Sequence, residues 1–146
     1  MSIYDRVHHI MVPLREASPE QRAWIAETAD LCDALCAEQE LTSPADRSLV
    51  SFVLQTAAEC LWQEGQRDWG RLDVDGYVDR VANAHPAEGS EHAHLCVHVL
   101  SLFFAWMAET KRMRRSVALR QVRRLLRHCT TGDYSAQIPM DASLVS

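Results

Sequence analysis

The densest group of side chains that could bind a metal lies between residues 92 and 98 of this 146-residue chain. Histidine and cysteine alternate there with other residues, so on a β-strand all four would lie on one face. In a helix, which the surrounding apolar residues predict, they separate into two i, i+4 pairs, and each pair supplies at most two ligands. We therefore expect neither a bound metal nor a cofactor. The metal candidates are His92, His94, Cys96 and His98.

A second group of polar residues resembles part of a calcium-binding loop. Asp73-Val74-Asp75-Gly76 matches the middle of an EF-hand loop. With this glycine in the required place, Arg71 would occupy the first ligand position and Ala82 the last, which excludes calcium. The chain also lacks a P-loop, a dinucleotide glycine fingerprint, an HExxH motif and a GxSxG elbow. We expect no catalysis, although a metal-dependent helical enzyme with scattered residues would escape this search.

The feature that says most about function is a basic stretch between residues 111 and 128, with eight lysines and arginines and no acid. The chain has a net charge of −5, and without these eight cations it would be −13. Such asymmetry indicates an anionic partner rather than a particular fold. The candidate residues for binding nucleic acid or another anion are Lys111, Arg112, Arg114, Arg115, Arg120, Arg123, Arg124 and Arg127.

Four of these cations repeat with helical spacing. A helix over residues 117–129 would bring them to one face and would turn Leu119, Val122 and Leu126 toward the core. The planar fork of arginine pairs with phosphate and carboxylate better than the ammonium of lysine does. Such a surface could therefore follow a nucleic-acid backbone and bind it in a salt-sensitive way. This arginine stripe consists of Arg120, Arg123, Arg124 and Arg127.

Other roles for the arginine stripe remain open. Acidic helices of the same chain could pair with it, and cations late in a helix are favoured by the macrodipole. The chain has no zinc-finger spacing, RNP aromatic motif or leucine zipper, and a helix-turn-helix joined at residues 113–115 would lack its turn glycine. We predict a noncatalytic binding module that engages nucleic acid within a larger complex. The anionic partner could also be an acidic protein surface. The alternative function is a protein-binding adaptor or inhibitor that acts through helix faces without contacting nucleic acid.

The elements that must position these residues are helices. Serine followed by proline predicts an N-cap and a first helical position, and Gln21 is placed to close a capping box with Ser18. Gly65 is the expected stop of the second helix, and His85-Pro86 that of the third. The expected caps are Ser18, Ser43, Asp73, Ser90 and Ser116, and the expected helices span about residues 19–38, 44–64, 74–84, 91–112 and 117–129.

These elements predict an all-α fold, a compact single-domain bundle of five to six helices. The short linker 39–42 makes the first two helices an antiparallel hairpin. The helix over about 91–112 is apolar on most of its circumference and belongs at the centre, whereas that over about 117–129 is basic and amphipathic. We expect the domain to cover residues 1–132, with 133–146 a flexible tail or docking arm. Residues 3–14 could form a short helix or an extended strand.

One stripe of the helix over 91–112 consists of histidines and small residues. Small side chains let two helices approach closely, so a homodimer contact could form along this stripe. Its members are His94, His98, Ser101, Ala105 and Ala108.

The amino-acid composition of the chain predicts a globular protein of the cytoplasm. Hydrophobic residues make up 47% and charged residues 24%, far from the composition of disordered chains. Five cysteines, without a CxxC pair, indicate reduced core residues rather than disulfides. An early acid argues against a signal peptide, and the longest apolar stretch, residues 95–108, is shorter than the roughly 20 residues that span a bilayer. We therefore expect no membrane partner.

Residues 72–118 combine an apolar and aromatic helix pattern with a following basic stretch. The pattern is clearest at Val99-Leu100-Ser101-Leu102-Phe103-Phe104-Ala105-Trp106-Met107. Over about a third of the chain it resembles the helical core-binding domain of tyrosine recombinases. The resemblance implies contact with DNA and no catalytic residue.

Overall fold

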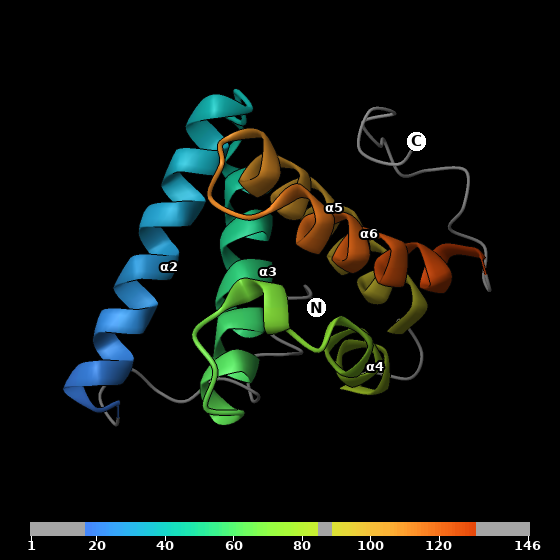
Figure 1. The fold of residues 1–146 in the computed structure, drawn as a ribbon, viewed down its shortest axis with the longest axis horizontal. Coiled ribbons are helices and arrows are strands. Elements are labelled where there is room, and N and C mark those ends of the chain that lie inside the picture. The colour runs from blue at the N-terminus through green and yellow to red at the C-terminus, as the bar shows by residue number, and fades with distance from the viewer. Residues whose placement is uncertain (1–16, 85–88, 131–146) are drawn as a thin grey trace. The chain divides into compact units, whose positions relative to one another are not determined.

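The computed structural model describes residues 17–84 and 89–130, and within them all regular structure is helical (Figure 1). This confirms the predicted all-α fold. The chain divides between Leu72 and Asp73 into two compact units. The expected domain end at residue 132, the tail 133–146 and residues 3–14 lie outside the described residues. The first unit contains α2 (Pro19–Glu38), α3 (Pro44–Gln63) and the short 3-10 helix η3 (Trp69–Arg71), and the second contains α4 (Val74–Ala84), α5 (Gly89–Glu109) and α6 (Arg115–Thr130).

Helices α2 and α3 begin as the sequence predicts. The hydroxyl of Ser18 accepts a hydrogen bond from the Gln21 amide at 3.1 Å, and that of Ser43 accepts one from the Asp46 amide at 3.4 Å. A proline follows each cap at the start of the helix, where its missing N–H costs nothing. Both predicted N-caps are confirmed.

The capping box predicted at Ser18 is not closed. The Gln21 side chain donates instead to the Glu59 carboxylate on α3, across 3.0 Å. Gln21 is buried, and its amide gains a partner by crossing to the neighbouring helix. The prediction for this side chain was therefore wrong, because a contact across 38 positions of sequence replaced the local one.

Helices α2 and α3 lie side by side in opposite directions (Figure 1). The indole N–H of Trp24 donates to the Ala58 carbonyl at 2.8 Å, and farther along α2 Asp33 lies 3.8 Å from Arg47. Later residues of α2 thus contact earlier residues of α3, so the two helices are antiparallel. This confirms the predicted hairpin. The fully buried side chains of the two helices include Leu35, Val53, Leu54, Ala57 and Leu61.

Aromatic rings join the chain after α3 to this hairpin. The rings of Trp24 and Trp69 stack with centroids 5.8 Å apart, which attaches η3 to α2. The Arg67 guanidinium lies 3.7 Å from the centroid of the Trp62 ring and 5.7 Å from that of Trp24. Cation–π contacts of this kind contribute about 0.5–1 kcal/mol each at exposed sites. They fix the loop that Gly65 opens.

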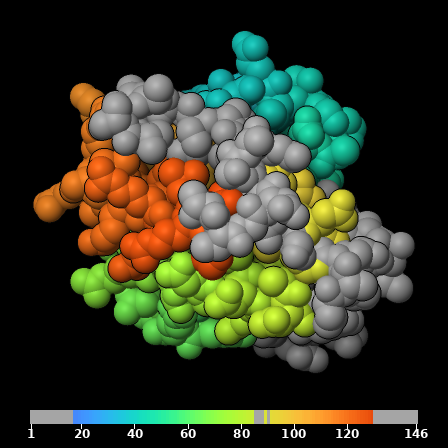
Figure 2. Space-filling model, turned by 90° about the vertical axis from the view of Figure 1, so that its right-hand side faces the viewer, coloured from blue at the N-terminus to red at the C-terminus, as the bar shows by residue number. Residues whose placement is uncertain are grey.

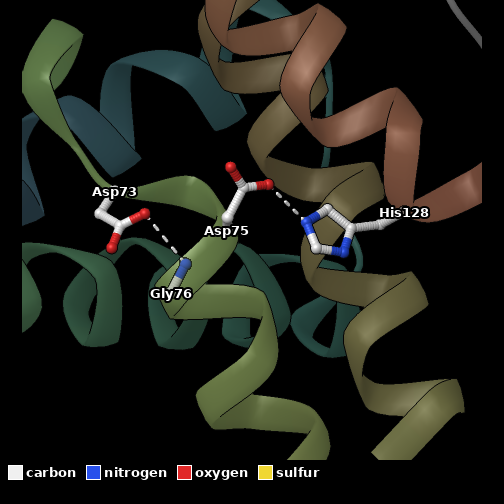
Figure 3. Close-up of polar contacts among 4 residues, drawn as sticks. All are labelled: Asp73, Asp75, Gly76 and His128. Carbon is white, nitrogen blue, oxygen red and sulfur yellow. Dashed lines mark hydrogen bonds and ion pairs between the residues drawn. The ribbon is translucent and has the colours of Figure 1, made fainter.

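In the second unit, Asp73 caps α4 as predicted. Its carboxylate accepts a hydrogen bond from the Gly76 amide at 3.0 Å (Figure 3). The described part of α4 ends at Ala84, and the predicted stop at His85-Pro86 lies outside the described residues. A Cβ on Gly89 would collide with the carbonyl of Ala82, so α5 can begin against α4 only with glycine there.

The ends of α5 and α6 differ from the prediction. Helix α5 runs from Gly89 to Glu109, so Ser90 lies inside its first turn rather than before it. Helix α6 begins at Arg115, and the Arg114 carbonyl accepts its first backbone hydrogen bonds, which places Ser116 inside the helix as well. Both predicted serine caps are wrong, because each helix starts one or two residues earlier than its polar signal indicates.

Helix α5 forms the apolar centre of the second unit, as its composition predicts. It packs against both α4 and α6. The side chains that α5 buries completely or nearly so include Val97, Leu100, Phe103, Phe104 and Trp106. The two helices that carry polar and charged faces are therefore held on one apolar support.

Candidate anion-binding surface

The arginine stripe lies along α6, as predicted. Arg120, Arg123 and Arg127 are exposed, and Arg124 is half-buried. Figure 2 shows atoms of α6, in orange to red, at the molecular surface beside those of α4 in lime green. Three of the four arginines of the stripe are therefore well exposed to solvent.

The buried face of α6 is rotated from the one that the sequence predicts. Leu119 and Leu126 are only half-buried, and of the three predicted core residues Val122 alone is fully buried. The helix packs instead through Ala118, Gln121, Val122, Leu125 and Cys129. Small residues at both ends of this face let α6 lie close against its neighbours, and a pattern based on large apolar residues overlooks them.

The last turn of α6 is attached to α4 by a polar contact. His128 Nε2 lies 2.8 Å from Asp75 Oδ1, and the two side chains point toward each other (Figure 3). Sequence reasoning missed this pair, because its members stand 53 residues apart and no local spacing joins them. The contact fixes the C-terminal end of the stripe relative to α4.

The arginines of the stripe differ in their contacts. Arg120 and Arg127 each interact with another group of the chain. Arg123 and Arg124 form no ion pair or hydrogen bond with any residue in the described ranges. These two guanidinium groups are the part of the stripe with the most donors left for an external anion.

The remaining four cations of the basic stretch lie where α5 ends and α6 begins. All four side chains are exposed. The Arg112 guanidinium lies 4.4 Å from the centroid of the buried Trp106 ring, which orients its head group. Together with the stripe, these residues make α6 and the connection that precedes it strongly positive. They are Lys111, Arg112, Arg114 and Arg115.

The metal candidates are placed on α5 as the helix prediction requires. Cys96 is fully buried, accepts a hydrogen bond from the Tyr77 hydroxyl at 3.7 Å, and has its pKa raised to about 12 by burial. A thiol held neutral in this way is a poor metal ligand. Among the residues that the structure describes, no three histidine, cysteine or acidic side chains are grouped to hold a metal.

Two of the α5 histidines lie near each other. His94 and His98 are half-buried and lie one turn apart. Burial lowers the pKa of His98 below its ordinary value of 6.5, and the nearby His94 lowers it further. His92 is buried, with only 6% of its surface exposed. The four candidate side chains thus face different surroundings and do not meet at one point.

The proposed homodimer stripe is partly covered in the single chain. Ser101 and Ala105 are only 2% and 9% exposed. His94, His98 and Ala108 are half-buried. A second copy could reach the two ends of the stripe but not its middle, and the homodimer stays a prediction.

Comparisons with protein-family models, with curated proteins and with solved structures found no match to this chain. None of the helices in residues 17–84 and 89–130 has the length and apolar character needed to cross a membrane. The recombinase resemblance therefore stays an expectation from the sequence pattern, and the case for function depends on the side chains themselves.

Proposed function

We propose that this chain is a noncatalytic helical binding module whose arginine-rich helix α6 engages an anionic partner, foremost nucleic acid within a larger complex. The observation that carries the proposal is the pair Arg123 and Arg124, which lies within the exposed stripe and forms no ion pair with any described residue. Unpaired guanidinium groups on a helix packed against an apolar support suit repeated phosphate contacts.

The dimensions of the stripe suit a nucleic-acid strand. Arg120 and Arg127 are separated by seven residues of helix, or about 10 Å at the usual rise. Successive phosphates of one strand advance by about 3.4 Å along a duplex axis, so the stripe can contact roughly three or four phosphates. Contacts of this kind hold the backbone without reading sequence. We therefore expect little sequence preference.

The charge of the remaining chain limits the strength of this binding. The net charge is −5, so a polyanion is repelled at long range and contact depends on the local positive surface. Binding by three or four phosphate contacts should weaken about 40- to 150-fold between 50 and 200 mM salt. A steep salt dependence with modest affinity is the expected signature.

Fluorescence anisotropy of labelled DNA and RNA oligonucleotides at these two salt concentrations tests the proposal. Arg123→Gln/Arg124→Gln should lower the affinity and, with two contacts removed, reduce the salt-dependent loss about tenfold. The matched control is Arg47→Gln/Arg71→Gln, which removes two charges from long surface ion pairs in the first unit and should bind as the parent does. Equal affinity for the parent and the stripe variant would remove α6 from the interface.

The second candidate is a protein-binding adaptor, and the acidic side of α2 favours it. This helix exposes carboxylates along its whole length, so it can face a basic protein surface. Absence of oligonucleotide binding at 50 mM salt, together with copurification of a basic protein that is lost on charge reversal of α2, would support this function instead. The exposed acids are Glu20, Glu27, Asp30, Asp33 and Glu38.

A further inference from the structure

A shallow, open hollow of about 500 Å³ with a strongly basic lining lies at the connection between α5 and α6. Of the six described residues that line it, four carry a positive charge and none is acidic. This basic hollow stands at the N-terminal end of the helix that carries the arginine stripe. It is lined by Ala108, Lys111, Arg112, Met113, Arg114 and Arg115.

The backbone around the basic hollow is held in one conformation. Helix α5 ends with the Arg112 amide donating to the Met107 carbonyl at 2.8 Å and the Lys111 amide donating to the Ala108 carbonyl at 3.1 Å. These two bonds form a Schellman motif, with Lys111 in the left-handed region at φ 61°. Glycine adopts this conformation at less cost, so the lysine brings a cation to the hollow at the expense of backbone strain.

Two further features increase the positive potential at the hollow. The stacking of Arg112 on the Trp106 ring, at 4.4 Å, positions its guanidinium before any ligand arrives. The hollow also adjoins the first residue of α6, a 16-residue helix with no acid in its first turn to offset the positive end of its dipole. An oriented guanidinium and an uncompensated helix start both favour an anion of high charge density.

We propose that the basic hollow binds the terminal phosphate of a nucleic-acid strand whose backbone follows the arginine stripe. This inference rests on the function proposed above. A terminal phosphomonoester carries close to two negative charges at neutral pH and three unesterified oxygens, whereas an internal phosphodiester carries one charge. Four cations around one hollow therefore favour the end of a strand over its interior, and the hollow lies where a strand on α6 would reach the start of the helix.

Anisotropy with three oligonucleotides of one sequence tests the inference, with a 5′-phosphate, a 3′-phosphate or hydroxyls at both ends. We expect one phosphorylated form to bind at least tenfold more tightly than the hydroxyl-ended form. Lys111→Gln/Arg114→Gln should bring this ratio close to one. Arg123→Gln/Arg124→Gln should weaken all three forms and keep the ratio, and Arg47→Gln/Arg71→Gln should change neither.

The outcomes separate the basic hollow from the arginine stripe. Equal affinity for all three oligonucleotides, with steep salt dependence, would overturn the terminal-phosphate site and leave the proposed function standing. A tenfold ratio that survives in Lys111→Gln/Arg114→Gln would place the terminal phosphate elsewhere and also overturn the site. Failure of every oligonucleotide to bind at 50 mM salt would overturn both proposals. Circular dichroism of each variant confirms that the compared proteins are folded.

Discussion

The side-chain amide of Gln21 on α2 donates a hydrogen bond to the Glu59 carboxylate on α3, across 3.0 Å. Glu59 accepts a second bond, from the Gln63 amide at 3.3 Å, so each of its oxygens has a neutral donor. No cation pairs with this buried carboxylate among the described residues. The α2–α3 interface therefore contains an acid whose charge is costly to bury, and its protonation is linked to folding.

The first prediction concerns the pH dependence that Glu59 imposes. Burial raises its pKa above the ordinary value of 4.5, although the hydrogen bonds from Gln21 and Gln63 oppose the shift. The folded chain thus binds this proton more tightly than the unfolded chain, and stability falls as pH rises above about 4.5. Glu59→Gln should remove that loss, so urea unfolding at several pH values should show a more stable protein at pH 7. Glu27→Gln, on the exposed side of α2, is the control, and a Glu59→Gln protein with the parent's pH slope would contradict the prediction.

The second prediction concerns His98, whose effect on stability depends on pH in the opposite direction. Its pKa lies below 6.5 because burial, and then the neighbouring His94, disfavour its charged form. The unfolded chain therefore takes up this proton first, and stability falls as pH drops below about 6.5. His98→Gln should flatten the thermal stability between pH 7.5 and 5.5. An unchanged pH profile would show that His98 does not titrate differently on unfolding.

The third prediction concerns the ends of α2, α3 and α5, which all close with a Schellman pattern of backbone bonds. Gly65 occupies the left-handed position after α3, but Glu40 and Lys111 occupy it after α2 and α5, at φ 55° and 61°. Glu40→Gly and Lys111→Gly should each stabilise their unit by about 0.5–1 kcal/mol, because glycine relieves the strain at these positions. Gly65→Ala, the reverse change, should destabilise by about 1 kcal/mol. Urea unfolding measures all three, and loss of stability in both glycine variants would refute the account.

The fourth prediction concerns Asp75 and His128. The side chains are 47% and 21% exposed, so solvent screens their attraction, and we expect a coupling energy of no more than about 1 kcal/mol. Asp75 also lies in the first turn of α4, where the helix dipole favours a carboxylate, so a single change would measure both effects. A double-mutant cycle with Asp75→Asn and His128→Gln isolates the pair. A coupling of several kcal/mol would mean that the pair is far better shielded than its exposure indicates.

Local chemistry was enough to predict most of the helices. The Ser-Pro starts of α2 and α3, and the cap at Asp73, need only residues within four positions of one another. The same reasoning failed at Ser90 and Ser116, because each helix starts before its polar signal. Local patterns predict where a helix lies better than where it starts.

The candidate site was predictable in part for the same reason. The arginine stripe depends on spacing within one helix, and the structure places it on α6 as the spacing requires. The Asp75–His128 contact and the transfer of the Gln21 amide to Glu59 join distant parts of the sequence. The basic hollow depends on how α5 ends, and neither Lys111 in the left-handed region nor Arg112 on Trp106 could be predicted from composition. Three-dimensional contacts decide these features.

The five buried cysteines can report on the opening of the two units. Cys32, Cys36 and Cys60 belong to the first unit, and Cys96 and Cys129 to the second. Burial raises the pKa of Cys32 and of Cys96 to about 12, so neither thiol reacts while it stays inside the protein. The rate at which an alkylating reagent modifies each cysteine therefore measures how fast the unit that contains this cysteine opens. Equal rates mean that the two units open together as one cooperative body. Faster modification of the cysteines in the first unit means that α4–α6, with the basic face, can stay folded while the α2–α3 hairpin unfolds.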